Sequence, residues 1–242
     1  ISELASVHPD AKLGKDVEIE PFATVMGDVE IGDGTRVCSH AVIQPYSRIG
    51  SGCTIHPGAV VGGVPQDLKF RGEITYAIIG NNTVIRECAT VNRGTASKGK
   101  TVVGDDCLIM AYCHVAHDCV LGNHVIMSNA TQLAGEVVVD DWAVLGGGTL
   151  AHQFTHIGAH VMVQGGTRIN KDIPPYVLAG REPVCYVGLN SVGLRRRNFP
   201  SEIVNDIQSI YRTIYLSGYN IKEAIEHIED EIQPSSVRDE II

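Results

Sequence analysis

Residues 114–119, His-Val-Ala-His-Asp-Cys, join two histidines to a carboxylate and are the segment of the chain best suited to chemistry. Histidine accepts and releases a proton near neutral pH, so His117 fits the role of a general base. The adjacent Asp118 would fix the tautomer of the imidazole and stabilise the imidazolium that forms. No serine or cysteine lies convincingly beside His117, which favours a general base over a covalent nucleophile. A histidine with purely structural hydrogen bonds is the alternative that this motif alone leaves open.

The elements that must position this pair are indicated by a repeat of six residues. Apolar residues hold 25 positions of one phase, with two pauses. They are Val7, Leu13, Ile19, Val25, Ile31, Val37, Ile43, Ile49, Ile55, Val61, Ile79, Ile85, Val91, Val103, Ile109, Val115, Leu121, Met127, Leu133, Val139, Leu145, Ala151, Ile157, Val163 and Ile169. Neither the helical period of about 3.6 nor the strand period of about two explains this pattern. It predicts a triangular coil with three six-residue sides per turn and strands of successive turns about 4.8 Å apart.

A turn of 18 residues predicts which side chains stack on one another. Gly135 would lie over His117, and Gln153 would lie one turn further on. Glu136 would lie over Asp118 in the same way. The backbone N–H of a glycine could stabilise an oxyanion without obstruction by a side chain. The stack of His117, Gly135 and Gln153 suits acyl transfer to a hydroxyl, because that reaction needs a base poised near neutral pH.

Cysteine and histidine patterns elsewhere in the chain favour packing over metal binding. The seven cysteines form no Cys-x-x-Cys pair, which argues for reduced thiols in the cytosol rather than disulfides or a zinc site. Four of them occupy the small-residue position of the repeat, namely Cys53, Cys107, Cys113 and Cys119. His152, His156 and His160 are four residues apart, but on six-residue sides they point to different places. We therefore expect neither a metal nor a cofactor.

Charge and hydropathy exclude two further classes of partner. The net charge of −9 argues against nucleic acid. No apolar run of about 18 residues occurs, so no transmembrane segment is expected. The chain opens without a basic segment followed by an apolar stretch, so no secretion signal is visible. Together with the unpaired cysteines, these features predict a cytoplasmic protein.

The repeat also predicts how the chain is divided. We expect a coil over residues 1–173 that loop insertions interrupt near 62–77 and 94–100. Such insertions often carry the binding surface, although a plain solvated loop is the alternative for the first. Paired prolines end the coil, because proline removes strand donors. Residues 174–198 are expected to be a linker with a basic segment, and apolar residues at helical spacing predict a helical domain over 199–242.

A run of three arginines, residues 195–197, follows the coil in an otherwise acidic chain. Such a run is often only a solvated face. At the end of the coil, however, it is placed where phosphate groups or an acidic protein would need partners. We therefore favour a binding role for this segment.

Five segments, taken in order, resemble one family. They are Gln66-Asp67-Leu68-Lys69, His114-Val115-Ala116-His117-Asp118-Cys119, Ala151-His152-Gln153-Phe154, Pro174-Pro175-Tyr176 and Arg195-Arg196-Arg197. The chain resembles the UDP-N-acetylglucosamine O-acyltransferases of lipid A biosynthesis, which are hexapeptide-repeat acyltransferases. The resemblance implies a mainly β fold, a left-handed parallel β-helix of hexapeptide repeats with a C-terminal α-helical region. It also implies transfer of an (R)-3-hydroxyacyl group from acyl carrier protein to the 3-hydroxyl of UDP-N-acetylglucosamine, in a homotrimer with active sites between subunits.

The resemblance also assigns roles to individual residues. His117 would be the general base, Asp118 would orient it, and Gly135 would supply the oxyanion N–H. The residues implied to hold the sugar nucleotide are Asp67, Lys69, His114, His152, Gln153, Asn190, Arg196 and Arg197. Gly165 matches a position that limits acyl length and would leave room for a long chain. The sequence departs from the family pattern at Glu136, where a histidine is common, so Glu136 would raise the pKa of His117 or contact the 3-hydroxyl of the donor.

Other functions remain open at this point. An N-acyltransferase of the same pathway would normally carry a further N-terminal domain. A hexapeptide acetyltransferase that uses acetyl-CoA typically lacks the Gln-Asp-Leu-Lys loop and the triple arginine. A γ-type carbonic anhydrase shares the coil but needs three histidines on zinc. A scaffold without activity would have no reason to place a His-Asp pair over a glycine.

Overall fold

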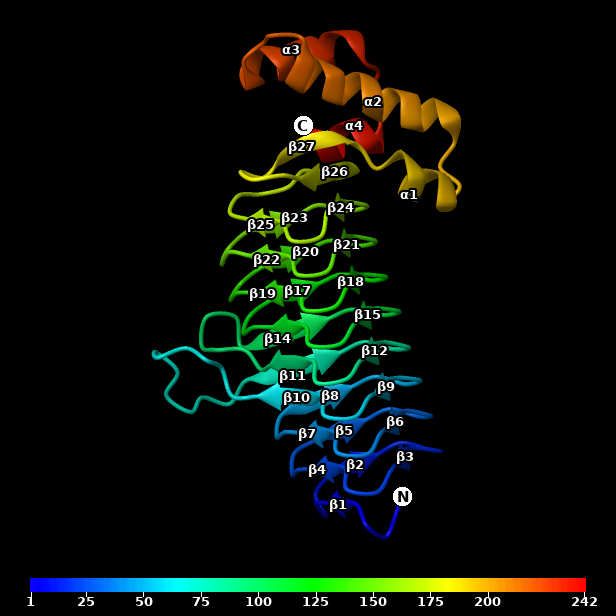
Figure 1. The fold of residues 1–242 in the computed structure, drawn as a ribbon, viewed down its shortest axis with the longest axis vertical. Helices are drawn as coiled ribbons and strands as arrows, with labels where there is room; N and C mark the ends of the chain where they lie inside the picture. Colours follow the sequence, from blue (N-terminus) through cyan, green and yellow to red (C-terminus); the bar gives the residue numbers. More distant parts are fainter.

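The computed structural model describes all 242 residues as a column of short strands with helices at one end (Figure 1). The strands form three sheets, one along each side of a triangular coil. Within the coil every neighbouring pair is parallel. The first sheet holds nine strands: β1 (Ser6–Val7), β4 (Thr24–Val25), β7 (Val42–Ile43), β10 (Val60–Gly63), β13 (Thr90–Asn92), β16 (His114–Val115), β19 (Gln132–Leu133), β22 (Leu150–Ala151) and β25 (Arg168–Ile169).

The other two sheets follow the same order along the column. The second sheet holds β2 (Lys12–Leu13), β5 (Glu30–Ile31), β8 (Ser47–Ile49), β11 (Tyr76–Ile79), β14 (Lys100–Val103), β17 (Val120–Leu121), β20 (Val138–Val139) and β23 (His156–Ile157). The third sheet holds β3 (Glu18–Ile19), β6 (Arg36–Val37), β9 (Thr54–Ile55), β12 (Val84–Ile85), β15 (Leu108–Ile109), β18 (Ile126–Met127), β21 (Val144–Leu145), β24 (Met162–Val163), β26 (Val177–Gly180) and β27 (Cys185–Leu189).

The six-residue repeat fills the interior of the coil. Ile55, Ile85 and Leu133 are 0 % exposed, and they belong to one continuous apolar cluster. Burial of such large aliphatic side chains is the main favourable contribution to folding. Cys119 occupies the small-residue position, and burial raises the pKa of its thiol to about 12, so the thiol stays protonated as a packing group.

The register between turns is the predicted 18 residues. Val115 pairs with Leu133, and the corner residues that follow stack in the same way. Asp118, Glu136 and Phe154 have φ values of 62°, 62° and 68°, so each makes the same left-handed corner on successive turns. The stacking predicted from the sequence is therefore present.

Two loops leave the column in the region of β10 to β14. Residues 64–75 connect β10 to β11, and residues 93–99 connect β13 to β14. The first loop projects to one side of the column in Figure 1. Its base is closed by hydrogen bonds to the second loop, since the Gly94 N–H donates to Tyr76 O at 3.1 Å and the Thr75 hydroxyl donates to Gly94 O at 2.5 Å. The two loops therefore act as one insertion beside the coil.

Four helices cover the C-terminal end of the coil: α1 (Ser191–Arg196), α2 (Ser201–Leu216), α3 (Ile221–Glu231) and α4 (Ser236–Ile241). The buried hydroxyl of Tyr211 in α2 donates to Pro175 O at 2.6 Å, which ties the helices to the last turn. Asn220 and Glu223 form a capping box that starts α3. No helix has the length and apolar composition to cross a membrane.

The expectation that residues 174–198 form a linker after a coil ending at 173 is wrong. β26 continues the third sheet, and β27 turns back antiparallel to it. The repeat failed to predict β26 because Met162 pairs with Leu178, a step of 16 residues rather than 18. Asn190 then caps α1 by accepting a hydrogen bond from the Gly193 N–H, so two strands and the start of a helix occupy the range expected to be a linker.

Candidate active site

His117 and Asp118 form a hydrogen-bonded pair at the corner between β16 and β17. His117 Nδ1 lies 2.9 Å from Asp118 Oδ2, and the Asp118 side chain is 0 % exposed. A carboxylate accepts hydrogen bonds and donates none, so Nδ1 carries the proton and Nε2 keeps its lone pair. The His117 side chain is 18 % exposed, which leaves its ring open to a substrate. The pair therefore has the arrangement of a general base and the group that orients it.

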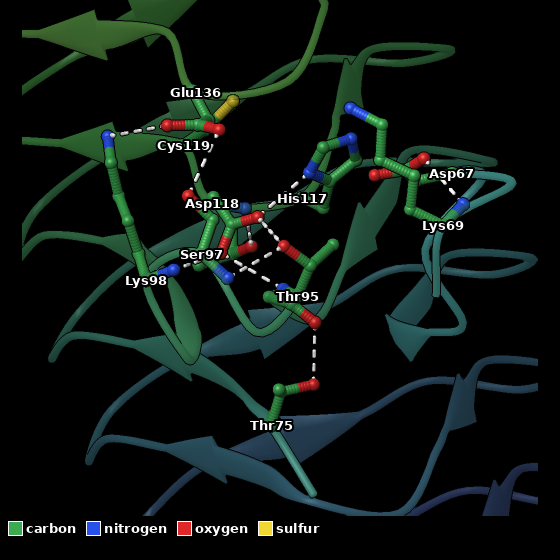
Figure 2. Close-up of polar contacts among 12 residues, drawn as sticks. Asp67, Lys69, Thr75, Thr95, Ser97, Lys98, His117, Asp118, Cys119 and Glu136 are labelled. Carbon is green, nitrogen blue, oxygen red and sulfur yellow. Dashed lines mark hydrogen bonds and ion pairs between the residues drawn. The ribbon is translucent and has the colours of Figure 1, made fainter. Parts of the chain in front are cut away.

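The loop of residues 93–99 supplies the remaining hydrogen-bond donors to the Asp118 carboxylate. Thr95 donates to the carboxylate twice, from its N–H at 2.9 Å and from its hydroxyl at 2.6 Å. The Lys98 N–H donates at 3.2 Å. Burial alone would raise the pKa of Asp118, but the hydrogen bonds from Thr95, His117 and Lys98 outweigh it and hold the pKa below its ordinary value. Asp118 is therefore a fixed anion at the Nδ1 edge of the His117 ring (Figure 2).

The next turn of the coil places Gly135 against His117. A Cβ atom at Gly135 would lie 2.5 Å from Cε1 and 2.7 Å from Nε2 of the ring, so only glycine leaves the ring in place. The Glu136 N–H donates to His117 O at 3.0 Å and fixes the spacing of the two turns. The Gly135 N–H makes none of the hydrogen bonds within the coil. It is thus a free donor beside the free ring nitrogen.

Both loops meet the coil around a cavity of about 250 Å³. Its lining residues come from the two loops and from the corner above Asp118: Asp67, Lys69, Phe70, Glu73, Thr95, Ala96, Ser97 and Glu136. Glu136 holds the second loop, because the Ser97 hydroxyl donates to it at 3.2 Å and Lys98 Nζ lies 3.9 Å from it. The structure therefore brings the predicted residues Asp67, Lys69 and Glu136 together (Figure 2).

His114 precedes the corner that holds His117 and Asp118, on β16. Its Nδ1 lies 2.7 Å from the Thr90 hydroxyl of the neighbouring strand β13. Burial lowers the pKa of His114, and the charge that His117 can carry lowers it further. His114 is therefore a neutral hydrogen-bonding group near neutral pH, suited to holding a substrate rather than to transferring a proton.

Other predicted residues lie farther along the column or at other corners. His152 and Gln153 are exposed two turns beyond His117, at the same corner. Gly165 lies at the corner between β24 and β25, which is a different edge of the column. A Cβ atom at Gly165 would lie 3.1 Å from Gly147 O, so the backbone of adjacent turns is close there. A single chain does not bring Gly165 to His117.

The residues predicted after the coil lie along a third edge. Asn190 is 9 % exposed and donates to His160 O at 2.8 Å, in addition to capping α1. Arg197 donates to Trp142 O at 2.8 Å, and its guanidinium lies 5.2 Å from the centre of the Trp142 ring. Arg196 is exposed. Within one chain, Asn190, Arg196 and Arg197 are therefore at a different edge from His117.

Sequence reasoning missed Thr90, Thr95 and the Ser97-Lys98 pair. The pause in the repeat marked the second loop, and a threonine there is unremarkable by itself. Nothing in the local pattern shows that Thr95 contacts a residue 23 positions later. The one available signal was that a buried Asp118 carboxylate needs hydrogen-bond donors, which hydroxyl residues could supply.

Comparison with known proteins identifies the family. Residues 172–242 match the model for domain 2 of UDP-N-acetylglucosamine O-acyltransferases, and residues 10–45 and 100–135 match the model for bacterial transferase hexapeptides. The acyl-[acyl-carrier-protein]–UDP-N-acetylglucosamine O-acyltransferase of Thermodesulfovibrio yellowstonii is 43 % identical over 233 residues, which are 96 % of this chain and 90 % of that protein. The chain belongs to the UDP-N-acetylglucosamine O-acyltransferase family.

Solved structures of the acyltransferase family share the whole architecture. The UDP-N-acetylglucosamine acyltransferase of Bacteroides fragilis is 51 % identical, with a TM-score of 0.98 over 100 % of this chain and 94 % of that one. The Francisella novicida enzyme is 35 % identical, with a TM-score of 0.96 over 99 % of this chain and 88 % of that one. The predicted fold class is confirmed: a left-handed parallel β-helix of hexapeptide repeats with C-terminal helices.

Proposed function

We propose that this chain transfers an (R)-3-hydroxyacyl group from acyl carrier protein to the 3-hydroxyl of UDP-N-acetylglucosamine, as a step of lipid A biosynthesis. The donor and the acceptor are those in the names of its relatives. One observation carries the chemistry: His117 Nδ1 is bound to a buried carboxylate, while Nε2 faces the turn that holds Gly135. That arrangement supports proton removal from a hydroxyl.

The proposed reaction has no covalent enzyme intermediate. Nε2 of His117 accepts the proton of the sugar hydroxyl as its oxygen attacks the thioester carbonyl. The carbonyl oxygen gains the negative charge, and the free N–H of Gly135 donates to it. When the C–S bond breaks, the imidazolium returns the proton to the sulfur, so the carrier leaves as a thiol and His117 is restored. The Asp118 anion stabilises the imidazolium between these two steps.

The cavity beside this pair is proposed to hold the sugar nucleotide. Lys69 provides a cation for the diphosphate, and Asp67 accepts hydrogen bonds from hydroxyl or amide groups. His114 is proposed to contact the sugar as a neutral group. Glu136 is already engaged with the second loop, and its free acceptor capacity suits the 3-hydroxyl of the acyl donor.

We propose a homotrimer with each site shared between two subunits. The predicted substrate residues of one chain lie along different edges of the column, and a second copy beside it would supply those that one edge lacks. Gly165, Asn190, Arg196 and Arg197 would then come from the neighbour of the chain that supplies His117. His152 and Gln153 would extend the site along the catalytic corner. We further propose that the protein works in the cytoplasm, where seven unpaired thiols stay reduced.

A competition among donors and acceptors tests this function. Purified protein is offered 3-hydroxyacyl carrier protein or acetyl-CoA, with UDP-N-acetylglucosamine or its 2-amino, 3-O-acylated counterpart as acceptor. We expect a product with the mass of the 3-O-acyl sugar nucleotide, whose ester is cleaved by mild alkali. An alkali-stable amide product would instead identify an N-acyltransferase, and a product from acetyl-CoA alone would identify an acetyltransferase.

A further inference from the structure

Arg93 is the only buried cationic side chain that lies outside any ion pair in this chain. It is 8 % exposed, and its Nη1 has no hydrogen-bond partner. The only other buried side-chain nitrogen or oxygen without a hydrogen-bond partner is Nδ2 of Asn92, the residue before it. An uncompensated buried charge is strongly unfavourable unless its surroundings stabilise it. An arginine at this position therefore calls for a physical explanation.

Two aromatic rings supply the missing stabilisation. The guanidinium carbon of Arg93 lies 4.8 Å from the centre of the Tyr46 ring and 5.1 Å from that of Phe70. Guanidinium groups are attracted to aromatic faces at such distances, and more strongly when water is excluded. Tyr46 belongs to the coil, directly before β8, whereas Phe70 belongs to the loop of residues 64–75. Arg93 therefore joins the loop to the rigid column.

The backbone of Arg93 is fixed at the base of both loops. Its N–H donates to Gly63 O at 2.9 Å, at the end of β10. The next residue, Gly94, donates to Tyr76 O, where the first loop returns to the coil. The guanidinium is thus presented from a fixed point, and Phe70 is the loop residue that rests on it.

We propose that Arg93 is a positioning residue, which holds the loop of residues 64–75 through Phe70 and so places Asp67 and Lys69 for the sugar nucleotide. Phe70 is adjacent to Lys69, and both line the cavity beside Asp118 together with Asp67. Arg93 is assigned no contact with the substrate, because its guanidinium lies against the Tyr46 and Phe70 rings and Arg93 is not among the residues that line the cavity. This inference rests on the proposed function for the identity of the ligand, and on the contacts alone for the position of the loop.

The steady-state constants of substituted proteins distinguish a positioning role of Arg93 from a role in folding. Arg93→Met removes the charge at similar length, and Phe70→Leu removes the ring from a loop. In each we expect the KM for UDP-N-acetylglucosamine to rise about tenfold while kcat changes less than about threefold, because the base is untouched. The double variant should show little further rise, since both changes break one contact. Phe70→Tyr keeps an aromatic face and should restore a nearly normal KM.

A matched control uses Arg86, which pairs with Glu87 on the surface of the same region. Arg86→Met should leave both constants unchanged. If Arg93→Met fails to fold, as judged by its far-UV circular dichroism, Phe70→Leu still decides the proposal. Unchanged KM in Phe70→Leu, or a fall in kcat with KM unchanged, would overturn it.

Amide hydrogen exchange supplies a readout that needs no activity. The Phe70 N–H donates to Asp67 O at 3.0 Å, and the Lys69 N–H donates to Asp67 Oδ1 at 2.9 Å. Both amides should exchange several-fold faster in Phe70→Leu than in the wild type, while amides of the coil stay protected. Equal exchange would reject the positioning role. If the amides exchange faster in Phe70→Leu but the wild type transfers no acyl group, the positioning role stands and the proposed function is rejected.

Discussion

Asp118→Asn is the substitution that probes the His117 tautomer most selectively. It keeps the size and shape of the side chain and replaces one acceptor oxygen with an NH2 donor. In the wild type, Oδ1 accepts the N–H groups of Thr95 and Lys98, and Oδ2 accepts the Thr95 hydroxyl and His117 Nδ1–H. The side-chain amide of the Asp118→Asn variant can therefore adopt two orientations, and these differ in free energy.

With the NH2 group at the Oδ1 position, two backbone N–H groups would face a donor, at a cost of about 1–3 kcal/mol each. With the NH2 group at the Oδ2 position, the Thr95 hydroxyl can rotate to accept, and His117 Nδ1 must become an acceptor. The second orientation is favoured, and it moves the ring proton to Nε2. Because Nε2 then has no lone pair for the substrate, kcat should fall about a thousandfold or more, as in other His-carboxylate pairs. Loss of the anion should also lower the free energy of unfolding by about 2 kcal/mol.

The assay measures kcat for acyl transfer and the urea midpoint of the same preparation. Asp140→Asn is the matched control, because Asp140 accepts from His156 Nε2 at 2.7 Å in an exposed pair on another part of the column. It should keep full activity. A folded Asp118→Asn protein with kcat within about threefold of the wild type would refute the tautomer argument.

Two further predictions concern Gly135 and His160, which lie at different edges of the coil. Gly135→Ala should lower kcat at least about a hundredfold, because its Cβ would displace the His117 ring. Gly147→Ala is the control and should not, because its Cβ would meet no ring and only the Asn129 carbonyl oxygen, at 3.3 Å. Equal activities of the two variants would contradict this prediction. Burial, reinforced by Arg197, lowers the pKa of His160 to about 4. An unfolded histidine titrates near about 6.5, so unfolding takes up a proton below that pH and stability is lost as the pH falls towards about 4. Urea unfolding should show a loss of about 2 kcal/mol between pH ~6.5 and ~4.5 that His160→Phe lacks; an equal loss in that variant would contradict the assignment.

The sequence predicted the stacking of Gly135 on His117 well because one physical constraint governs it. Large side chains fill a triangular interior every six residues, so the turn length and the stacking of Gly135 on His117 follow from counting. The same counting placed four cysteines in the core rather than in a metal site.

Contacts outside the repeat could not be predicted in this way. Thr95 reaches Asp118 from a loop whose path depends on tertiary hydrogen bonds. β26 follows a shortened turn, so its pairing escaped a search at a fixed period. Arg197 was predicted from a basic run, but its contact with Trp142 depends on how α1 packs beside the coil. Local sequence contains little information about such long-range packing.

The central claim is that His117 is the general base for direct acyl transfer to the sugar hydroxyl. The most direct measurement compares wild type with His117→Ala, using UDP-N-acetylglucosamine and 3-hydroxyacyl carrier proteins of several chain lengths. We predict transfer to the 3-hydroxyl by the wild type and a rate at least about a thousandfold lower in the variant, with UDP-N-acetylglucosamine binding retained. A folded His117→Ala protein that transfers the acyl group at a rate close to that of the wild type would contradict the account.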